Sequence, residues 1–250
     1  MRLPRVQINP TSRRAAVFHT LYLILLPLLV VTFVWIDFPL AAFTIIFLSK
    51  WRMFAVRPRY WLANIRANSV DITVGFSVVS LMNGSTTFVT WLVWGVLYAV
   101  WLIFLKPKSR PVLVGAQAFI AQGIGLVALF GNNSEWHPVF LVIVSWVICF
   151  SAARHLLIVF EDSANRVMSH IWALFASFIV IILSRWHIEY GGIVPQVALI
   201  LSIVGYGLGS GYYIHKTSGL RSGVRTQLLF FVVTALALSI AKPIAAGLCL

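Results

Sequence analysis

Three polar residues at helical spacing, Asn64, Asn68 and Asp71, could together bind a cation or a polar solute. If a helix begins after Pro58, a favoured first-turn residue, their i, i+4 and i+7 spacing places them on one face. Gly75 continues that face one turn further and would leave room for a ligand. Because polar groups inside a membrane are costly, they are functional candidates by default, and we predict a ligand or ion site here. The alternative is that Asp71 caps the following helix, where a carboxylate is favourable.

Three glutamines within apolar runs are further candidates for a ligand or ion site: Gln117, Gln122 and Gln196. Amide side chains inside a membrane either bond between helices or line a polar path. Gln117 and Gln122 are five positions apart and therefore do not share one helix face. Hydrogen bonding between helices is the simpler of the two roles.

A group of titratable residues lies between two apolar runs, and convergence of its members would permit proton transfer or metal binding. Its spacing matches no metal motif, so no metal site is predicted. Asp162 and Arg166 are four residues apart and would pair on a helix. A solvated cytoplasmic turn with ordinary surface ion pairs is the simpler interpretation. The group comprises Arg154, His155, Glu161, Asp162, Arg166 and His170.

The elements that carry these residues are apolar. Hydrophobic residues make up 60% of the chain and charged residues only 10%, against about 25% charged residues in a soluble domain. Lipid must therefore be the solvent for much of the chain. The net charge of +13 comes from Lys and Arg placed between apolar runs, which is typical of membrane topology and argues against nucleic-acid binding.

About 20 apolar residues cross a ~30 Å hydrocarbon core. The chain therefore predicts an all-α, polytopic integral membrane helical bundle with about nine transmembrane helices. Residues 1–14 form a basic cytoplasmic arm and residues 15–250 a single transmembrane domain. The second span is either a full crossing or a re-entrant hairpin. The expected spans are 15–36, 40–56, 70–82, 88–105, 112–130, 138–160, 167–184, 193–214 and 226–248.

The positive-inside rule orients these spans with the N-terminus in the cytoplasm and the C-terminus outside. In that orientation 17 of the 19 lysines and arginines face the cytoplasm. We expect a multi-pass protein of the cell membrane, with anionic lipid headgroups as a partner on the cytoplasmic face. The expected headgroup contacts are Lys50, Arg52, Arg57, Arg59 and Arg66.

Two further patterns concern helix packing. Gly205 with Gly209, and Gly207 with Gly211, form GxxxG pairs that allow close helix approach and could support oligomerisation. An aromatic row at i, i+3, i+7 and i+10 marks one face of the fourth span, and we expect it to pack or to contact lipid. The row consists of Trp91, Trp94, Tyr98 and Trp101.

Two family resemblances are carried by short motifs. Lys50 with Arg57 and Pro58 resembles the first motif of a family of membrane acid phosphatases, but the Pro-Ser-Gly-His motif which that family also needs is absent. Residues 16–19, Ala-Val-Phe-His, look similar to the start of the heliorhodopsin family. That resemblance would make Asp71 the counterion and Lys242 the retinal lysine. The heliorhodopsin family has seven spans and a long outer loop after the first, whereas this chain predicts nine spans and short loops.

The expected function is transport of a small solute or ion, because intramembrane polar residues occur with Pro27, Pro195 and a glycine run that would break or soften helices. A non-catalytic membrane subunit or scaffold is the alternative, and a retinal-binding, rhodopsin-like protein is the third. An enzyme is less expected, because only the group at residues 154–170 offers clustered chemistry. No cofactor is predicted.

Overall fold

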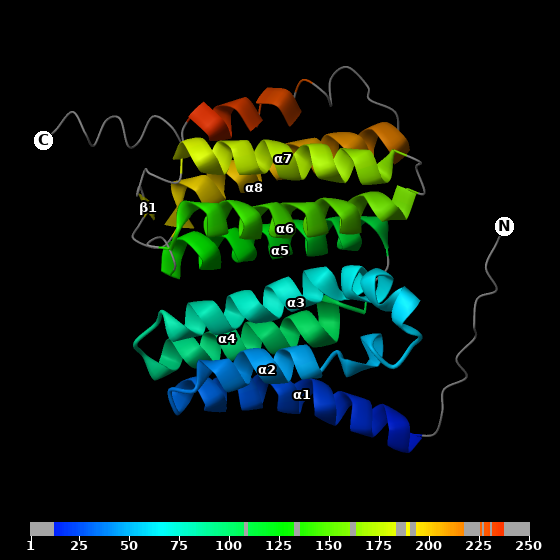
Figure 1. Ribbon diagram of the computed structural model, residues 1–250, viewed down its shortest axis with the longest axis vertical. Helices are drawn as coiled ribbons and strands as arrows, with labels where there is room; N and C mark the ends of the chain where they lie inside the picture. Colours follow the sequence, from blue (N-terminus) through cyan, green and yellow to red (C-terminus); the bar gives the residue numbers. More distant parts are fainter. Residues whose placement is uncertain are drawn as a thin grey trace, which may run out of the picture.

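The computed structural model describes residues 13–107, 110–132, 136–160, 164–183, 189–190, 194–217, 226, 228–230 and 232–237. Within these ranges the chain is almost entirely helical, and the helices run back and forth side by side in one stack (Figure 1). The exception is a small antiparallel sheet of β1 (Glu189–Tyr190) and β2 (Val194–Pro195).

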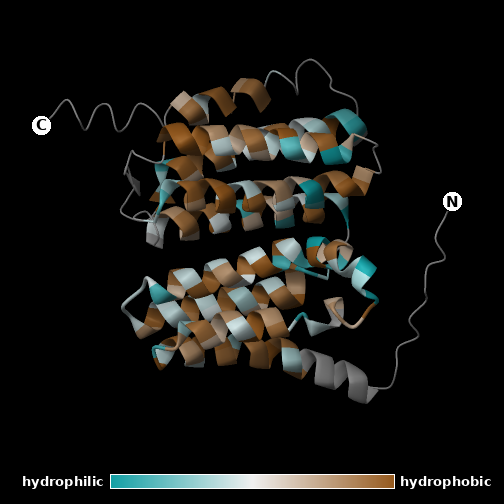
Figure 2. Ribbon diagram, viewed as in Figure 1, coloured by the Kyte–Doolittle hydropathy of each residue, from teal (hydrophilic) through white to brown (hydrophobic). Residues whose placement is uncertain are grey.

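Five of the described helices are long and apolar enough to cross a membrane. Three shorter apolar helices accompany them, at Leu21–Trp35, Pro39–Leu48 and Leu228–Ala237. Hydrophilic residues gather toward the helix ends, and apolar residues cover the middle of the stack (Figure 2). The composition and the structure therefore agree on a helical membrane protein. The five candidate spans are Phe88–Leu105, Pro111–Gly131, Pro138–Phe160, Asn165–Leu183 and Gln196–Lys216.

The N-terminal half of the stack contains four helices around one apolar core. The turn between the first two has a positive φ of 56° at Asp37, a residue type that tolerates this conformation, and Pro39 then starts the next helix. Thr87 caps the fourth helix by accepting a hydrogen bond from the Thr90 N–H. The helices are α1 (Arg13–Trp35), α2 (Pro39–Leu48), α3 (Trp61–Asn83) and α4 (Phe88–Val100), and α4 continues as a π-helical segment, η3 (Trp101–Leu105).

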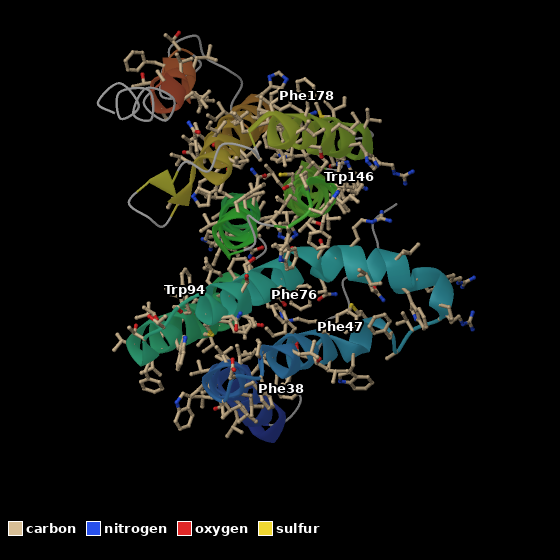
Figure 3. The ribbon with its side chains drawn as sticks, turned by 60° about the vertical axis from the view of Figure 1, so that its left-hand side comes forward. Phe38, Phe47, Phe76, Trp94, Trp146 and Phe178 are labelled. Carbon is tan, nitrogen blue, oxygen red and sulfur yellow. The ribbon has the colours of Figure 1, made fainter. Side chains whose placement is uncertain are left out.

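The C-terminal half has a second apolar core among four more helices. Contacts between α3 and α5 join the two halves. Large side chains on the outer side of α7, among them Phe178 at 61% exposure, point away from the neighbouring helices (Figure 3). Such a surface suits lipid contact. The helices are α5 (Pro111–Asn132), α6 (Pro138–Leu157) with a 3₁₀ turn η4 (Ile158–Phe160), α7 (Asn165–Leu183) and α8 (Gln196–Thr217).

Two of the expected spans, 88–105 and 138–160, match candidate spans of the structure residue for residue. The second expected span is wrong in length. Helix α2 ends at Leu48 and has ten residues, about 15 Å of helix and half of a ~30 Å core. Lys50, two residues after the end of α2, enters the interior and contacts Asp71.

The third span begins earlier than expected. Pro58 starts a 3₁₀ turn, η2 (Pro58–Tyr60), which leads directly into α3 at Trp61. Asp71 therefore lies ten residues inside α3, and the alternative that it caps a helix is wrong. Of the ninth expected span, the described residues are helical, and the rest lies outside the described residues.

The glycines of the expected GxxxG pairs face other segments of the same chain. A Cβ atom on Gly205 would lie 2.5 Å from the Gln122 amide nitrogen, and one on Gly207 would lie 2.5 Å from Val232. A Cβ atom on Gly209 would lie 3.0 Å from the Leu156 side chain, and one on Gly211 would lie 3.3 Å from the Leu228 side chain. Association between copies through these glycines stays a prediction.

Candidate functional site

Asp71 is 6% exposed, and three donors from different parts of the chain surround its carboxylate. Both lysine ammonium groups, of Lys50 and of Lys106, contact Oδ2, and the Lys106 Nζ lies 2.6 Å away. The indole Nε1 of Trp101 donates a hydrogen bond to Oδ1 at 2.9 Å. These four residues, together with Tyr98, are called the Asp71 cluster below.

The local backbone brings each lysine to the carboxylate. Lys50 follows the end of α2 directly, and the Tyr22 hydroxyl of α1 donates to the neighbouring Ser49 carbonyl at 3.3 Å. Lys106 follows the π-helical segment, and its own N–H donates to the Trp101 carbonyl at 2.9 Å. A π-helical turn shifts the residues after it relative to an α-helix and occurs often at functional sites. The four helices of the N-terminal half therefore all contribute to this site.

Tyr98 places a further buried donor next to Gly75, one turn of α3 beyond Asp71. Its ring is fully buried, and its hydroxyl has no hydrogen-bond partner among the described residues. A Cβ atom on Gly75 would lie 3.0 Å from this hydroxyl and 2.8 Å from Ile46. Glycine is therefore needed where α3 approaches α2 and α4.

The Asp71 cluster carries one more positive charge than negative. Two ammonium groups face one carboxylate, and each ammonium has three N–H donors. One contact from each lysine goes to Asp71, which leaves donors on both for a further acceptor. The Lys50 side chain is 7% exposed, whereas that of Lys106 is 35% exposed. Excess buried positive charge is costly, so the cluster favours an anion that arrives beside Lys106.

The two lysines differ in how firmly they hold their protons. Burial lowers the pKa of Lys50 to about 8, although the Asp71 carboxylate opposes this shift. Burial also disfavours the charged form of Lys106, but there Asp71 outweighs it and raises the pKa of Lys106. As the pH rises, Lys50 is therefore the first of the two to lose its charge.

The polar face predicted on α3 divides into two parts. The Asn64 amide donates to the Met53 carbonyl at 3.3 Å, and the Asn68 amide donates to the Asn64 carbonyl at 2.9 Å. Both asparagines thus satisfy nearby backbone, and only Asp71 enters the buried cluster. The expected cation site does not fit, because ammonium and indole donors already surround the carboxylate.

The expected lipid contacts need one correction. Lys50 is buried against Asp71 and does not reach a headgroup. Arg57, Arg59 and Arg66 are exposed, and the Arg59 guanidinium lies over the Tyr60 ring at 4.7 Å. The side chain of Arg52 lies outside the described residues.

The glutamines join helices. The Gln117 amide donates to the Leu105 carbonyl at the end of η3, and its oxygen lies 2.9 Å from the His155 ring Nε2 of α6. The Gln122 amide donates to the Leu201 carbonyl of α8 at 2.9 Å. Its oxygen accepts a hydrogen bond from the Trp172 indole of α7 at 3.1 Å. Gln196 begins α8 and is buried.

The two described histidines of the titratable group near the junction of α6 and α7 have different neighbours. His155 contacts Gln117. The His170 ring packs against Phe150 and Trp146, with ring centroids 4.6 and 5.6 Å apart, respectively. Glu161 and Asp162 lie outside the described residues. No three His, Cys, Asp or Glu side chains among the described residues could hold a metal ion together.

The sequence pattern does not identify the partners of Asp71. It places Lys50 at lipid headgroups, expects Tyr98 and Trp101 to pack or to contact lipid, and gives Lys106 no role. The signal was present, because the aromatic row places Tyr98 and Trp101 on one face shortly before Lys106. The Lys242 of the heliorhodopsin resemblance lies outside the described residues, and the described partners of Asp71 are Lys50, Lys106 and Trp101.

Comparison of the chain with protein-family models, with curated proteins and with solved structures gives no match. The site is therefore interpreted from its own chemistry.

Proposed function

We propose that this protein is a multi-pass membrane transporter that binds a small anionic solute at the Asp71 cluster. The observation that carries the proposal is the pairing of two lysines with one carboxylate oxygen inside the helix stack. A structural ion pair needs one cation for one anion. The second lysine gives the site an excess charge and spare donors that an anion would use.

Four residues of the cluster have roles in this proposal. Lys106, the more exposed lysine, meets the anion first. Lys50 and the Tyr98 hydroxyl supply donors further inside, and Asp71 holds both lysines in place through charge-assisted contacts. Because Asp71 cancels one of the two charges, the anion is attracted but still able to leave, as conduction or transport requires.

The membrane setting is part of the proposal. We place the N-terminus in the cytoplasm, the C-terminus outside and about nine spans in the cell membrane, on the strength of the distribution of Lys and Arg. The end of the stack where α1 begins is also where α2, α4 and α6 end (Figure 1). Lys106 then opens toward the cytoplasm, and exposed Arg57, Arg59 and Arg66 contact anionic headgroups.

A non-catalytic membrane subunit is the second candidate, and the C-terminal half favours it. The nitrogen and the oxygen of the Gln122 amide there each have a partner in the same chain, Leu201 and Trp172. Such bonds hold helices together and need no ligand. If the Asp71 cluster served only the same purpose, the protein would move no solute.

The proposal is tested by measuring flux into proteoliposomes with chloride, bicarbonate, phosphate and acetate as separate probes. Wild-type protein should accelerate the flux of at least one anion, and Lys106→Met should reduce that flux about tenfold or more, because one lost charge-assisted hydrogen bond is worth about 1.5–3 kcal/mol. Arg110→Met is the matched control, since Arg110 is exposed and lies at the start of α5 outside the cluster. Absence of flux for all four anions in folded protein would contradict transport and favour the subunit.

A further inference from the structure

A hydrogen-bonded bridge from the C-terminal half reaches the backbone next to Lys106. Leu105 is the last residue of η3 and directly precedes Lys106 of the Asp71 cluster. The side-chain amide of Gln117 in α5 donates a hydrogen bond to the Leu105 carbonyl. The oxygen of the same amide lies 2.9 Å from Nε2 of His155 in α6. These two contacts are called the Gln117 bridge below.

The chemistry of its groups gives the Gln117 bridge one direction. A backbone carbonyl only accepts hydrogen bonds, so the amide nitrogen of Gln117 must face Leu105. The amide oxygen therefore faces His155, and because this oxygen also only accepts, His155 carries a proton on Nε2. An amide turned the other way would place two oxygens against each other. The bridge thus has one satisfied arrangement.

The bridge restrains the peptide unit from which the Lys106 side chain departs. The carbonyl of this unit belongs to Leu105 and is held by Gln117, and its N–H donates to the Trp101 carbonyl at 2.9 Å. The last carbonyls of a helix lack partners within the helix, so a side chain that supplies one restrains the helix end. Gln117 is 4% exposed, and water therefore competes little for this contact. From the restrained unit, the Lys106 ammonium reaches the Asp71 carboxylate at 2.6 Å.

The other buried glutamine of α5 offers a comparison within the same helix. Gln122 also forms hydrogen bonds between helices, but its partners are Leu201 in α8 and Trp172 in α7. Neither partner is a chain neighbour of a residue in the Asp71 cluster. The two glutamines thus make similar bonds, but it is Gln117 that is bonded to the backbone beside Lys106.

We infer that Gln117 and His155 are positioning residues for Lys106, which hold its ammonium against Asp71 through the Leu105 carbonyl. The contacts run from α6 through α5 and η3 to α3. They therefore join the solute site to the C-terminal half, and a shift of α5 against η3 would move Lys106 away from the carboxylate. The placement of Lys106 follows from these contacts alone, whereas an effect on anion binding rests on the transport function proposed above.

The position of Lys106 is tested by the rate at which acetic anhydride modifies its amine, measured by mass spectrometry on purified full-length protein in a neutral detergent. An ammonium held by a carboxylate is protonated and shielded, and it reacts when it is released. Gln117→Leu removes the bridge and should raise the rate at Lys106 about fivefold, which corresponds to about 1 kcal/mol for one lost hydrogen bond. Lys216, which is exposed near the end of α8, is the internal reference and should react at one rate in every variant. No rise at Lys106 in Gln117→Leu would overturn the inference.

Variants of His155 and Gln122 separate positioning from a general loss of packing. His155→Leu removes the donor that orients Gln117 and should also raise the rate at Lys106, by less than Gln117→Leu. Because His155 is only partly buried, this variant decides the inference where Gln117→Leu does not fold. His155→Gln restores an N–H donor at a similar reach and should react like wild-type protein. Gln122→Leu is the matched control and should leave the rate unchanged, and an equal rise in Gln122→Leu and Gln117→Leu would contradict the inference.

Flux into proteoliposomes, with chloride, bicarbonate, phosphate and acetate as probes, tests the consequence for the solute site. For an anion that wild-type protein transports, Gln117→Leu should raise the half-saturating concentration about fivefold and leave the maximal flux nearly unchanged. Gln122→Leu should change neither quantity. A lower maximal flux with an unchanged half-saturating concentration in Gln117→Leu would contradict a role in positioning Lys106. Absence of wild-type flux would contradict the proposed function, and the rate of modification at Lys106 would still decide the inference.

Discussion

The two halves of the molecule differ in the polar group at the centre of each. In the α1–α4 half the central group is the Asp71 carboxylate, which holds two lysines and the Trp101 indole. In the α5–α8 half the central group is the Gln122 amide, which is neutral and bridges α7 and α8. The central group of one interior is charged and unbalanced, and the central group of the other is neutral and hydrogen-bonded at both its nitrogen and its oxygen.

This difference separates a structural role from a binding role. A neutral amide that bonds between membrane helices contributes a modest amount of stability and needs no ligand. A buried ion cluster is a poor source of stability, because desolvation offsets most of the attraction. An excess positive charge raises the cost of burying the cluster further, unless a bound anion neutralises it. The predictions below test whether the two halves differ in this way.

The largest effect is expected from Asp71→Asn. This change leaves two neighbouring ammonium groups without their carboxylate, and breaking a buried ion pair costs about 3–5 kcal/mol. Unfolding of purified protein followed by circular dichroism measures the loss. Lys106 is partly exposed and can turn to water, which places the expected loss in the lower part of this range.

The double variant Asp71→Leu with Lys50→Met serves as the control for that prediction. Replacement of a buried pair by apolar side chains is often neutral or stabilising, so most of the lost stability should return. A double variant that unfolds as readily as Asp71→Asn would show that the ion pair itself stabilises this half.

A smaller effect is expected from Gly75→Ala beside the cluster. The added Cβ would lie 2.8 Å from Ile46 and 3.0 Å from the Tyr98 hydroxyl, and overpacking of this kind costs about 1–3 kcal/mol. Gly205→Ala is the counterpart in the other half. There the Cβ meets the flexible end of the Gln122 side chain, so we expect a loss smaller than that of Gly75→Ala. Thermal unfolding of the two variants measures both losses. A larger loss of stability in Gly205→Ala than in Gly75→Ala would contradict this expectation.

The smallest loss of stability is expected from Gln122→Leu, although Gln122 is buried. The Trp172 indole loses its acceptor, and an unsatisfied buried donor costs about 1–3 kcal/mol, part of which the apolar leucine returns. We expect a net loss of about 1 kcal/mol in chemical unfolding. Anion binding at the Asp71 cluster should be unchanged. Weaker anion binding in this variant would show that Gln122 of the C-terminal half also contributes to the site.

The sequence alone predicted most of the helices but not the chemistry of the cluster. Apolar runs bounded by proline and charge located 88–105 and 138–160 correctly, because helix length in a bilayer follows from hydrophobic thickness. The same reasoning extends the second span too far, because it places Lys50 at lipid headgroups rather than against Asp71. Asp71 was singled out, but its partners come from positions 21 to 35 residues away, and only tertiary packing brings them together.

The measurement closest to the central claim is the stabilisation of wild-type protein by the anion that it transports, recorded from pH 6.5 to pH 9.5. Lys50 is charged below its pKa of about 8 and neutral above it, while the pKa of Lys106 is raised by Asp71 in spite of burial. The cluster therefore changes from one excess positive charge to none as the pH rises. The account predicts that anion stabilisation declines through pH 8 and that Lys50→Met shows no such decline. Stabilisation that stays constant across this range in wild-type protein, or that declines equally in Lys50→Met, would contradict it.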